Sequence, residues 1–150
     1  MTGVAGAAAE RVCRVDPSAE ENGLALMLRD MISQNLAARP ALWQIFRSLD
    51  ALIRVAPTDL EDVRVALDFR RGTLVVHDGD GPRRPTLTIR AEAEAVAEMP
   101  AVPLVLGLPD LRTADGRRLL ESLARGRLRI DGLVRHPDAL RKLSLLLAAA

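Results

Sequence analysis

The sequence has little of what most enzymes and metal proteins use. Its 150 residues contain no tyrosine, one cysteine (Cys13) and two histidines, His77 and His136. One cysteine excludes a disulfide within the chain and fits a reducing compartment, and the Cys/His pairs of a structural zinc site are absent. No serine lies in a Gly-x-Ser-x-Gly turn, and no phosphate-loop spacing occurs. These absences predict a protein that is not an enzyme and uses no metal or cofactor.

The few catalytic candidates have simpler interpretations. His77 falls in the polar register of a strand, which predicts exposure to solvent, and His136 precedes a proline at a helix start, which favours a capping or surface role. Cys13 lies far in sequence from both histidines. A small enzyme of another type stays an alternative, and loss of an activity on replacing His77 or His136, with folding intact, would reveal it.

No strong charge bias is present either: 21 basic residues balance 20 acidic ones, for a net charge of +1. Arginines alternate along the predicted outer sheet face, but no outward aromatic side chain is present on which bases could stack. Asp68 and Asp131 on that face predict cross-strand pairing with the arginines instead. We therefore expect no nucleic-acid partner. The outward arginines are Arg64, Arg90, Arg127 and Arg129.

Long apolar runs are also missing. No stretch approaches the roughly 20 apolar residues that span a bilayer, and the N-terminal residues have no basic segment typical of a secretory signal. We expect a cytoplasmic protein. Arg83 and Arg84, in the predicted exposed turn GPRRP, are candidates for transient contact with a membrane surface.

Aliphatic residues make up most of the apolar content, because hydrophobic residues are 49% of the chain and aromatic ones only 2%. Residues 1–15 are small and predict a flexible N-terminal tail, followed by a single domain over 16–150. After the helix-start signal DPSAEENG, apolar residues recur at helical spacing up to Leu36, and a second helix follows Pro40.

The apolar period then changes to two. LIRVA, VRVALDF, TLVVHDG, TLTIRA and RLRID are predicted strands, of which VRVALDF and TLVVHDG form a hairpin across the turn RRG. The better strands have one apolar and one polar face. This pattern indicates an α+β fold with a mostly antiparallel or mixed sheet, one side facing solvent and helices packed on the other. EAEAVAEM, TADGRRLLESLARG and HPDALRKLSLLLAAA are predicted helices, with the Pro-punctuated connector PAVPLVLGLPDLR between the first two.

This order of elements resembles the sterol carrier protein type 2 (SCP2-like) lipid-binding domain family, over roughly residues 22–147. The resemblance is carried by VRVALDFRRGTLVVHDG, PTLTIRAEAEAVAEM and LARGRLRIDGLVRHPDALRKLSLLL. It implies a five-stranded sheet with helices on one face around an apolar tunnel. It also implies non-enzymatic binding or transfer of sterol-like, hopanoid, isoprenoid, fatty-acyl or phospholipid ligands. The C-terminal AAA lacks the SKL peroxisomal signal of some eukaryotic members, which favours a bacterial type.

Inward strand positions and the apolar faces of three helices are the candidate tunnel lining. The structural alternative is an ordinary core, because a one-faced sheet needs an apolar cover with or without a cavity. A functional alternative is an accessory interaction module that presents a lipid intermediate to a biosynthetic complex. The sequence leaves the oligomeric state open. The candidate ligand-binding residues are Met27, Met31, Trp43, Phe46, Leu67, Phe69, Leu74, Val76, Leu87, Ile89, Leu143, Leu146 and Leu147.

Overall fold

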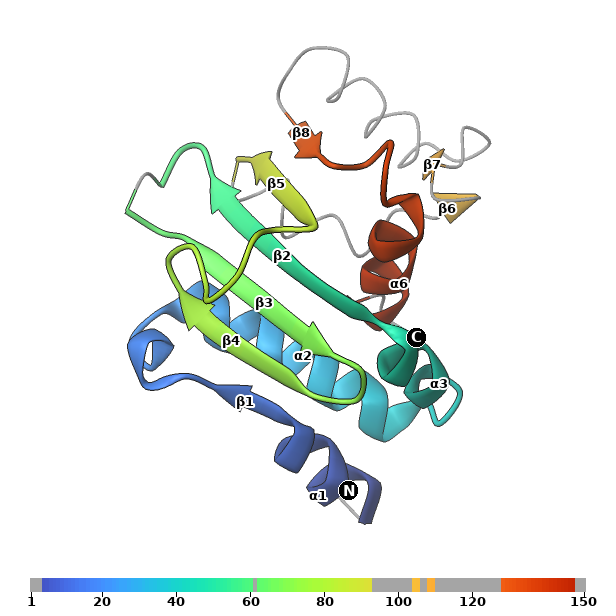
Figure 1. The fold of residues 1–150 in the computed structure, drawn as a ribbon. Helices are drawn as coiled ribbons and strands as arrows, with labels where there is room; N and C mark the ends of the chain where they lie inside the picture. The colour runs from blue at the N-terminus through green and yellow to red at the C-terminus, as the bar shows by residue number, and fades with distance from the viewer. Residues whose placement is uncertain (1–3, 61, 93–103, 106–107, 110–127, 148–150) are drawn as a thin grey trace.

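The computed structural model describes residues 4–60, 62–92, 104–105, 108–109 and 128–147. Within them a sheet is covered on one face by helices (Figure 1). The predicted helices EAEAVAEM, apart from its first residue Glu92, and TADGRRLLESLARG lie outside the described residues. The helices are α1 (Val4–Val12), α2 (Gly23–Ala38), α3 (Leu42–Ser48) and α6 (Pro137–Leu147), with a 3₁₀ turn η1 (Pro17–Ala19).

The main sheet has six strands in the order β1-β4-β3-β2-β5-β8. The strands are β1 (Cys13–Val15), β2 (Asp50–Pro57), β3 (Val65–Arg70), β4 (Leu74–Asp78), β5 (Leu87–Ala91) and β8 (Leu128–Asp131); the short β6 (Leu104–Val105) and β7 (Leu108–Pro109) form a separate pair. β1 pairs with β4, and β2 with β5, in parallel, while β2–β3, β3–β4 and β5–β8 are antiparallel. The mixed sheet is therefore confirmed, but it contains one strand more than the five expected.

The N-terminal segment supplies the extra strand. Residues 4–15 form α1 and β1, so the prediction of a flexible tail over residues 1–15 is wrong for this part. Ala9 and Cys13 are buried, and α1 packs against α2. The physical reason is that alanines favour a helix and their small side chains allow close approach, while β1 satisfies backbone groups at the open edge of β4.

Helix α2 begins after an N-cap at Asn22, near the end of the DPSAEENG segment. Asn22 Oδ1 accepts a hydrogen bond from the Ala25 N–H at 3.2 Å, which makes Asn22 the N-cap of the helix. Asp16 instead caps the 3₁₀ turn η1, where its side chain accepts from Ser18 N. Hydrogen bonds from the Ser18 hydroxyl and the Ser18 backbone N–H hold the pKa of Asp16 below its usual value. The sequence signal DPSAEENG thus contains two successive caps.

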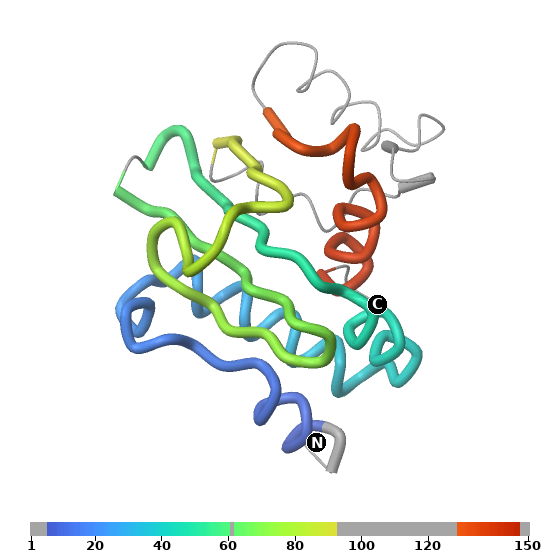
Figure 2. The backbone as a smooth tube through the Cα atoms, in the orientation of Figure 1, coloured from blue at the N-terminus to red at the C-terminus, as the bar shows by residue number. Residues whose placement is uncertain are grey.

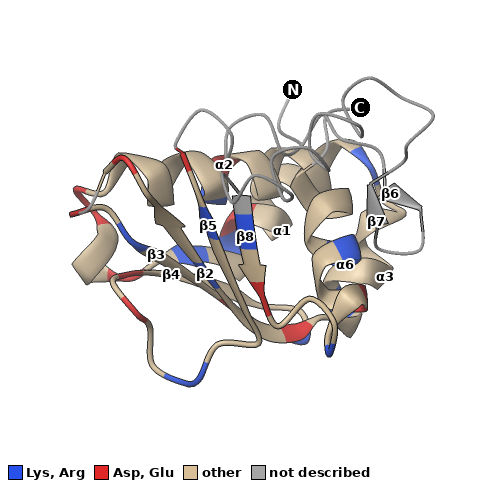
Figure 3. Cartoon of the chain, turned by 90° about the horizontal axis from the view of Figure 1, so that it is seen from above, with Lys and Arg blue, Asp and Glu red and all other residues tan. Residues whose placement is uncertain are grey.

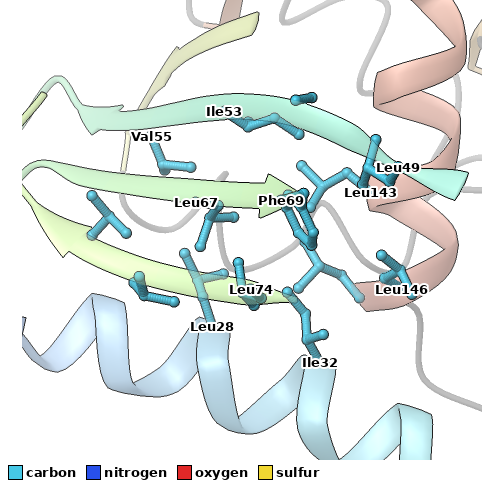
Figure 4. Packing of buried hydrophobic residues seen from close by; sticks show 14 of the residues in the cluster. Leu28, Ile32, Leu49, Ile53, Val55, Leu67, Phe69, Leu74, Leu143 and Leu146 are labelled. Atoms are coloured by element: carbon cyan, nitrogen blue, oxygen red, sulfur yellow. The ribbon is translucent and has the colours of Figure 1, made fainter. Parts of the chain in front are cut away.

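Helices α2, α3 and α6 cover the inner face of the sheet, where apolar side chains meet (Figures 1 and 4). Leu28 and Ile32 of α2 point toward β3 and β4, whereas Leu143 and Leu146 come from α6 (Figure 4). The register places Ile53 of β2 between Leu67 of β3 and Leu87 of β5, so the three side chains face inward together, as the period-two pattern predicts.

The outer face is not open to solvent throughout, which corrects the prediction of one solvent-facing side. Residues 79–86, here called the strap, connect β4 to β5 and run across β3 and β2 (Figure 2). The strap is anchored by the Thr86 N–H, which donates to the Leu52 carbonyl oxygen at 2.7 Å. Leu52, Ala66 and Asp68 of the outer face are buried. The alternation of apolar and polar residues along the strands could not predict that these positions are buried, because the residues that cover them belong to a loop.

Candidate functional site

Ten of the thirteen predicted ligand-binding residues lie in one buried apolar layer between the sheet and the helices. All ten belong to a continuous hydrophobic cluster that also includes residues of α2 and α3. The layer joins elements from both ends of the chain, as Figure 4 shows for strands β2–β4 and helices α2 and α6. The ten residues are Phe46, Leu67, Phe69, Leu74, Val76, Leu87, Ile89, Leu143, Leu146 and Leu147.

The other three predicted residues lie at the margin of the layer or outside it. Met31 and Trp43 are partly buried against it. The Trp43 indole N–H donates to the Leu36 carbonyl oxygen at 3.0 Å, and its ring meets that of Phe46 edge to face at 6.0 Å. Met27 is 37% exposed and lies outside the cluster. The apolar stripe predicted for α2 therefore included one residue, Met27, that does not face the layer.

Two polar side chains of α2 and its C-cap hold the C-terminal end of α6. Asn35 Nδ2 donates to the Leu146 carbonyl oxygen at 2.8 Å, and Arg39 Nη2 donates to the Leu145 carbonyl oxygen at 3.4 Å. The last carbonyls of a helix have no partner within it, so these bonds fix α6 over the sheet. The sequence carries no local signal for this contact, because the partners are more than 100 residues apart.

Cys13 is poorly suited to act as a nucleophile. The residue is 1% exposed, and burial raises the pKa of its thiol to about 12, an effect that the nearby charge of Arg29 only partly offsets. A thiol that stays neutral at physiological pH is a poor nucleophile. Among the described residues, no group of three or more His, Cys, Asp and Glu side chains could hold a metal ion.

The two histidines differ in their surroundings. His77 is more buried than predicted: its side chain is 18% exposed, and its Nδ1 lies 3.8 Å from Asp16 Oδ1. The reason is that the N-terminal segment packs beside β4, which the prediction of a flexible tail did not include. His136 is exposed, as expected, and its backbone N–H donates to the Gly132 carbonyl oxygen at 2.9 Å.

Two pockets have linings that the structure describes, and neither is lined by any of the thirteen predicted residues. One, of about 510 Å³, lies where η1 and the start of α2 meet the loop before β3. The other, of about 260 Å³, lies on the outer face of the sheet beside the strap. The apolar tunnel therefore stays a prediction. No described helix is long and apolar enough to cross a bilayer.

Comparison with known proteins gives matches among solved structures only. No family model matches the sequence, and no curated protein matches it. The structure of UbiJ-SCP2, a ubiquinone synthesis protein, matches with a TM-score of 0.58 at 17% identity. The match covers 83% of this chain and 92% of UbiJ-SCP2.

Two further matches differ in what they cover. The sec-alkylsulfatase Pisa1 from Pseudomonas sp. matches with a TM-score of 0.51 at 19% identity, over 72% of this chain but 14% of the sulfatase. Sterol carrier protein 2 gives a TM-score of 0.48 at 15% identity, over 83% of this chain and 96% of that protein. The sulfatase match involves a small part of a much larger enzyme. The match to UbiJ-SCP2 confirms the predicted resemblance at the level of the fold: this chain has the α+β fold of an SCP2-like domain.

Proposed function

We propose that this chain is a non-enzymatic lipid-binding protein that carries an apolar ligand between the inner face of its sheet and helices α2, α3 and α6. The ligand class is sterol-like, hopanoid, isoprenoid, fatty-acyl or phospholipid, and the site of action is the cytoplasm. The observation that carries the proposal is the SCP2-like fold, matched to UbiJ-SCP2 over most of both chains.

The chemistry of the layer is suited to this role. The ten buried residues are aliphatic or phenylalanine, and a lipid tail gains about 0.8 kcal/mol for each methylene that leaves water. Such binding needs no catalytic group, which agrees with the small number of catalytic candidates in the sequence. Met31 and Trp43 at the margin complete the proposed lining, whereas Met27 is left out because it is exposed.

Helix α6 is the proposed movable wall of the site. It contributes Leu143, Leu146 and Leu147 to the layer, and its contact with α2 combines apolar packing with side-chain hydrogen bonds near its C-terminal end. A small outward shift of α6 would open apolar space without breaking a strand pairing. The ligand would then fill the space between α6 and the sheet and keep the apolar side chains on both sides away from water.

Native mass spectrometry of the purified protein, followed by organic extraction and lipid analysis, tests the proposal. We expect a bound lipid at near-stoichiometric amount, and uptake of a fluorescent fatty acid or sterol by delipidated protein. Leu143→Gln should weaken uptake, while Val134→Gln, at a position that is 98% exposed, serves as the matched control. A lipid-free protein that takes up neither probe would contradict the proposal.

A second candidate is an accessory module that presents a lipid intermediate to a biosynthetic complex. It is favoured by one observation, that the matched UbiJ-SCP2 is named as a ubiquinone synthesis protein. Protein partners that copurify with the chain would support this function. A free protein that retains lipid, without partners, would support the carrier.

A further inference from the structure

The outer face of the sheet carries a pocket of about 260 Å³ with arginine walls. This face is opposite to the apolar layer, so the pocket is separate from the proposed lipid site. Basic residues lie on adjacent strands of the sheet (Figure 3). The lining consists of Arg54, Val55, Ala56, Arg64, Gly79, Asp80, Thr88 and Arg90.

Strand register explains why three arginines meet here. Arg54 of β2 pairs with Thr88 of β5, and Ala56 pairs with Arg90. Arg64 precedes β3 by one residue, and the antiparallel β2–β3 register continues to place it beside Ala56. Residues two apart on a strand share a face. The small side chains of Ala56 and Thr88 therefore form a floor between three guanidinium groups.

The arginines are only weakly paired with carboxylates. Within the lining, three positive charges face the single negative charge of Asp80. Asp80 Oδ1 lies 3.5 Å from Arg64 Nη1 and 4.0 Å from Arg54 Nε, and Arg90 Nη1 lies 4.0 Å from Asp131 Oδ2. Strong charge-assisted hydrogen bonds measure about 2.7–2.9 Å. These guanidinium groups therefore keep most of their capacity to bind an anion.

Arg54 is also oriented by the strap. Its Nε donates to the Asp80 carbonyl oxygen at 2.8 Å, and its side chain is the least exposed of the three. An oriented guanidinium loses less entropy when it binds a ligand. The strap thus helps to organise the pocket before a ligand arrives.

We propose that this arginine pocket binds a phosphate-type oxyanion, either a free phosphate compound or the headgroup of a phospholipid. Guanidinium groups match phosphate oxygens in geometry. Three of them, from β2, from β5 and from the residue before β3, suit a tetrahedral group, whereas a planar carboxylate would occupy a single guanidinium fork. The volume admits a phosphate group but no long apolar chain.

Two probes distinguish the sources: inorganic phosphate in calorimetric titration at constant ionic strength, and flotation with phosphatidylcholine vesicles with or without phosphatidylglycerol. The test variant is Arg64→Gln/Arg90→Gln. The control for each of the two substitutions is Arg14→Gln, which removes one positive charge from an exposed outer-face position on the distant edge strand β1. We expect the Kd for phosphate to rise about tenfold or more per arginine removed.

Loss of phosphate binding in the double variant, with binding retained in Arg14→Gln, supports the proposal. Binding to phosphatidylglycerol vesicles that depends on the same arginines assigns the headgroup as the source, and phosphate binding without vesicle binding assigns a free compound. Absence of binding to both probes, or equal binding by the double variant, overturns it. Thermal melts check folding, and fatty-acid uptake, expected to be unchanged, separates this result from the fate of the lipid-carrier proposal.

Discussion

The two faces of the sheet are both buried in part, but by different means. On the inner face, Leu67 and Ile89 are covered by apolar side chains from the helices. On the outer face, Leu52, Ala66 and Asp68 are covered by the strap. The inner cover relies on apolar burial, which has no directional requirement. The outer cover also depends on specific polar contacts.

Arg83 of the strap makes three of these polar contacts. Its Nε donates to Asp68 Oδ1 at 2.9 Å, and its Nη2 donates to the Phe69 carbonyl oxygen at 2.8 Å. The same Nη2 lies 2.9 Å from Asp50 Oδ1. Burial by itself would lower the pKa of Arg83, but the hydrogen bonds and charges of Asp50 and Asp68 outweigh burial and raise it. Arg83 is therefore half-buried and paired, which corrects the prediction that it lies on an exposed turn.

Equally buried positions on the two faces therefore differ in how well they tolerate substitution. An apolar layer accepts another apolar side chain of similar volume at small cost. A buried carboxylate such as Asp68 needs its partners, because an unpaired buried charge is expensive. A layer without directional contacts is also the one that can admit a ligand, which supports the placement of the proposed lipid site on the inner face.

The largest effect is expected for Leu67→Arg on the inner face. Leu67 is fully buried among apolar side chains, so a guanidinium there would have no partner and should cost more than about 4 kcal/mol, enough to abolish folding or lipid binding. Circular dichroism and urea unfolding measure the change. Val134→Arg is the control at a fully exposed apolar position. Unchanged stability of Leu67→Arg would refute the assignment of the inner face.

A smaller loss is expected when the outer network is broken. Arg83→Gln should lower the free energy of unfolding by about 1–3 kcal/mol, because Asp68 is left with Arg70 as its remaining partner. A double-mutant cycle with Asp68→Asn should give a coupling of about 1–2 kcal/mol. The neighbouring Arg84, which is exposed, provides the control Arg84→Gln. Additive effects in the cycle would show that the ion pair does not hold the strap.

Two glycines of the strap allow the cost of close packing to be measured apart from the cost of backbone strain. Gly79 and Gly81 have nearly equal positive φ, 79° and 81°. A Cβ at Gly81 would lie 2.7 Å from Ala66 Cβ, whereas one at Gly79 would meet nothing within 4 Å. Both alanine variants carry a strain cost of about 1 kcal/mol, and Gly81→Ala should lose about 1 kcal/mol more by overpacking. Equal melting temperatures would mean that the strap does not press on the sheet.

The smallest effect on the native state concerns Cys13, at the edge of the inner face. Its thiol should resist labelling by a thiol reagent until the protein unfolds, because it is buried and its pKa is raised from 9.0 to about 12. Between these values the unfolded thiol loses its proton while the folded thiol keeps it. Stability should therefore fall as pH rises through this window, and Cys13→Ala should remove that part of the fall. Fast labelling of the native protein would indicate that β1 is not docked.

The spacing of apolar residues is enough to assign which strand residues face inward and where the hairpin and the closing helix lie. Leu67, Leu74 and Ile89 are buried as predicted, because side-chain alternation records directly which face of a strand meets the core. The apolar stripe of α2 was likewise predictable, apart from Met27. These features are local, and a period of two or 3.6 residues is enough to encode them.

Three features become apparent only in the folded chain: the parallel pairing of β1 with β4, the strap over the outer face and the capping of α6 by Asn35. Each joins segments that are distant in sequence, and no periodic pattern specifies a partner across such a distance. Asp68 shows what the pattern cannot predict. Its polar side chain predicted exposure to solvent, but in the structure the residue is buried and paired with Arg83. The arginine pocket has the same origin, since strand register brought together three charges that the sequence separates.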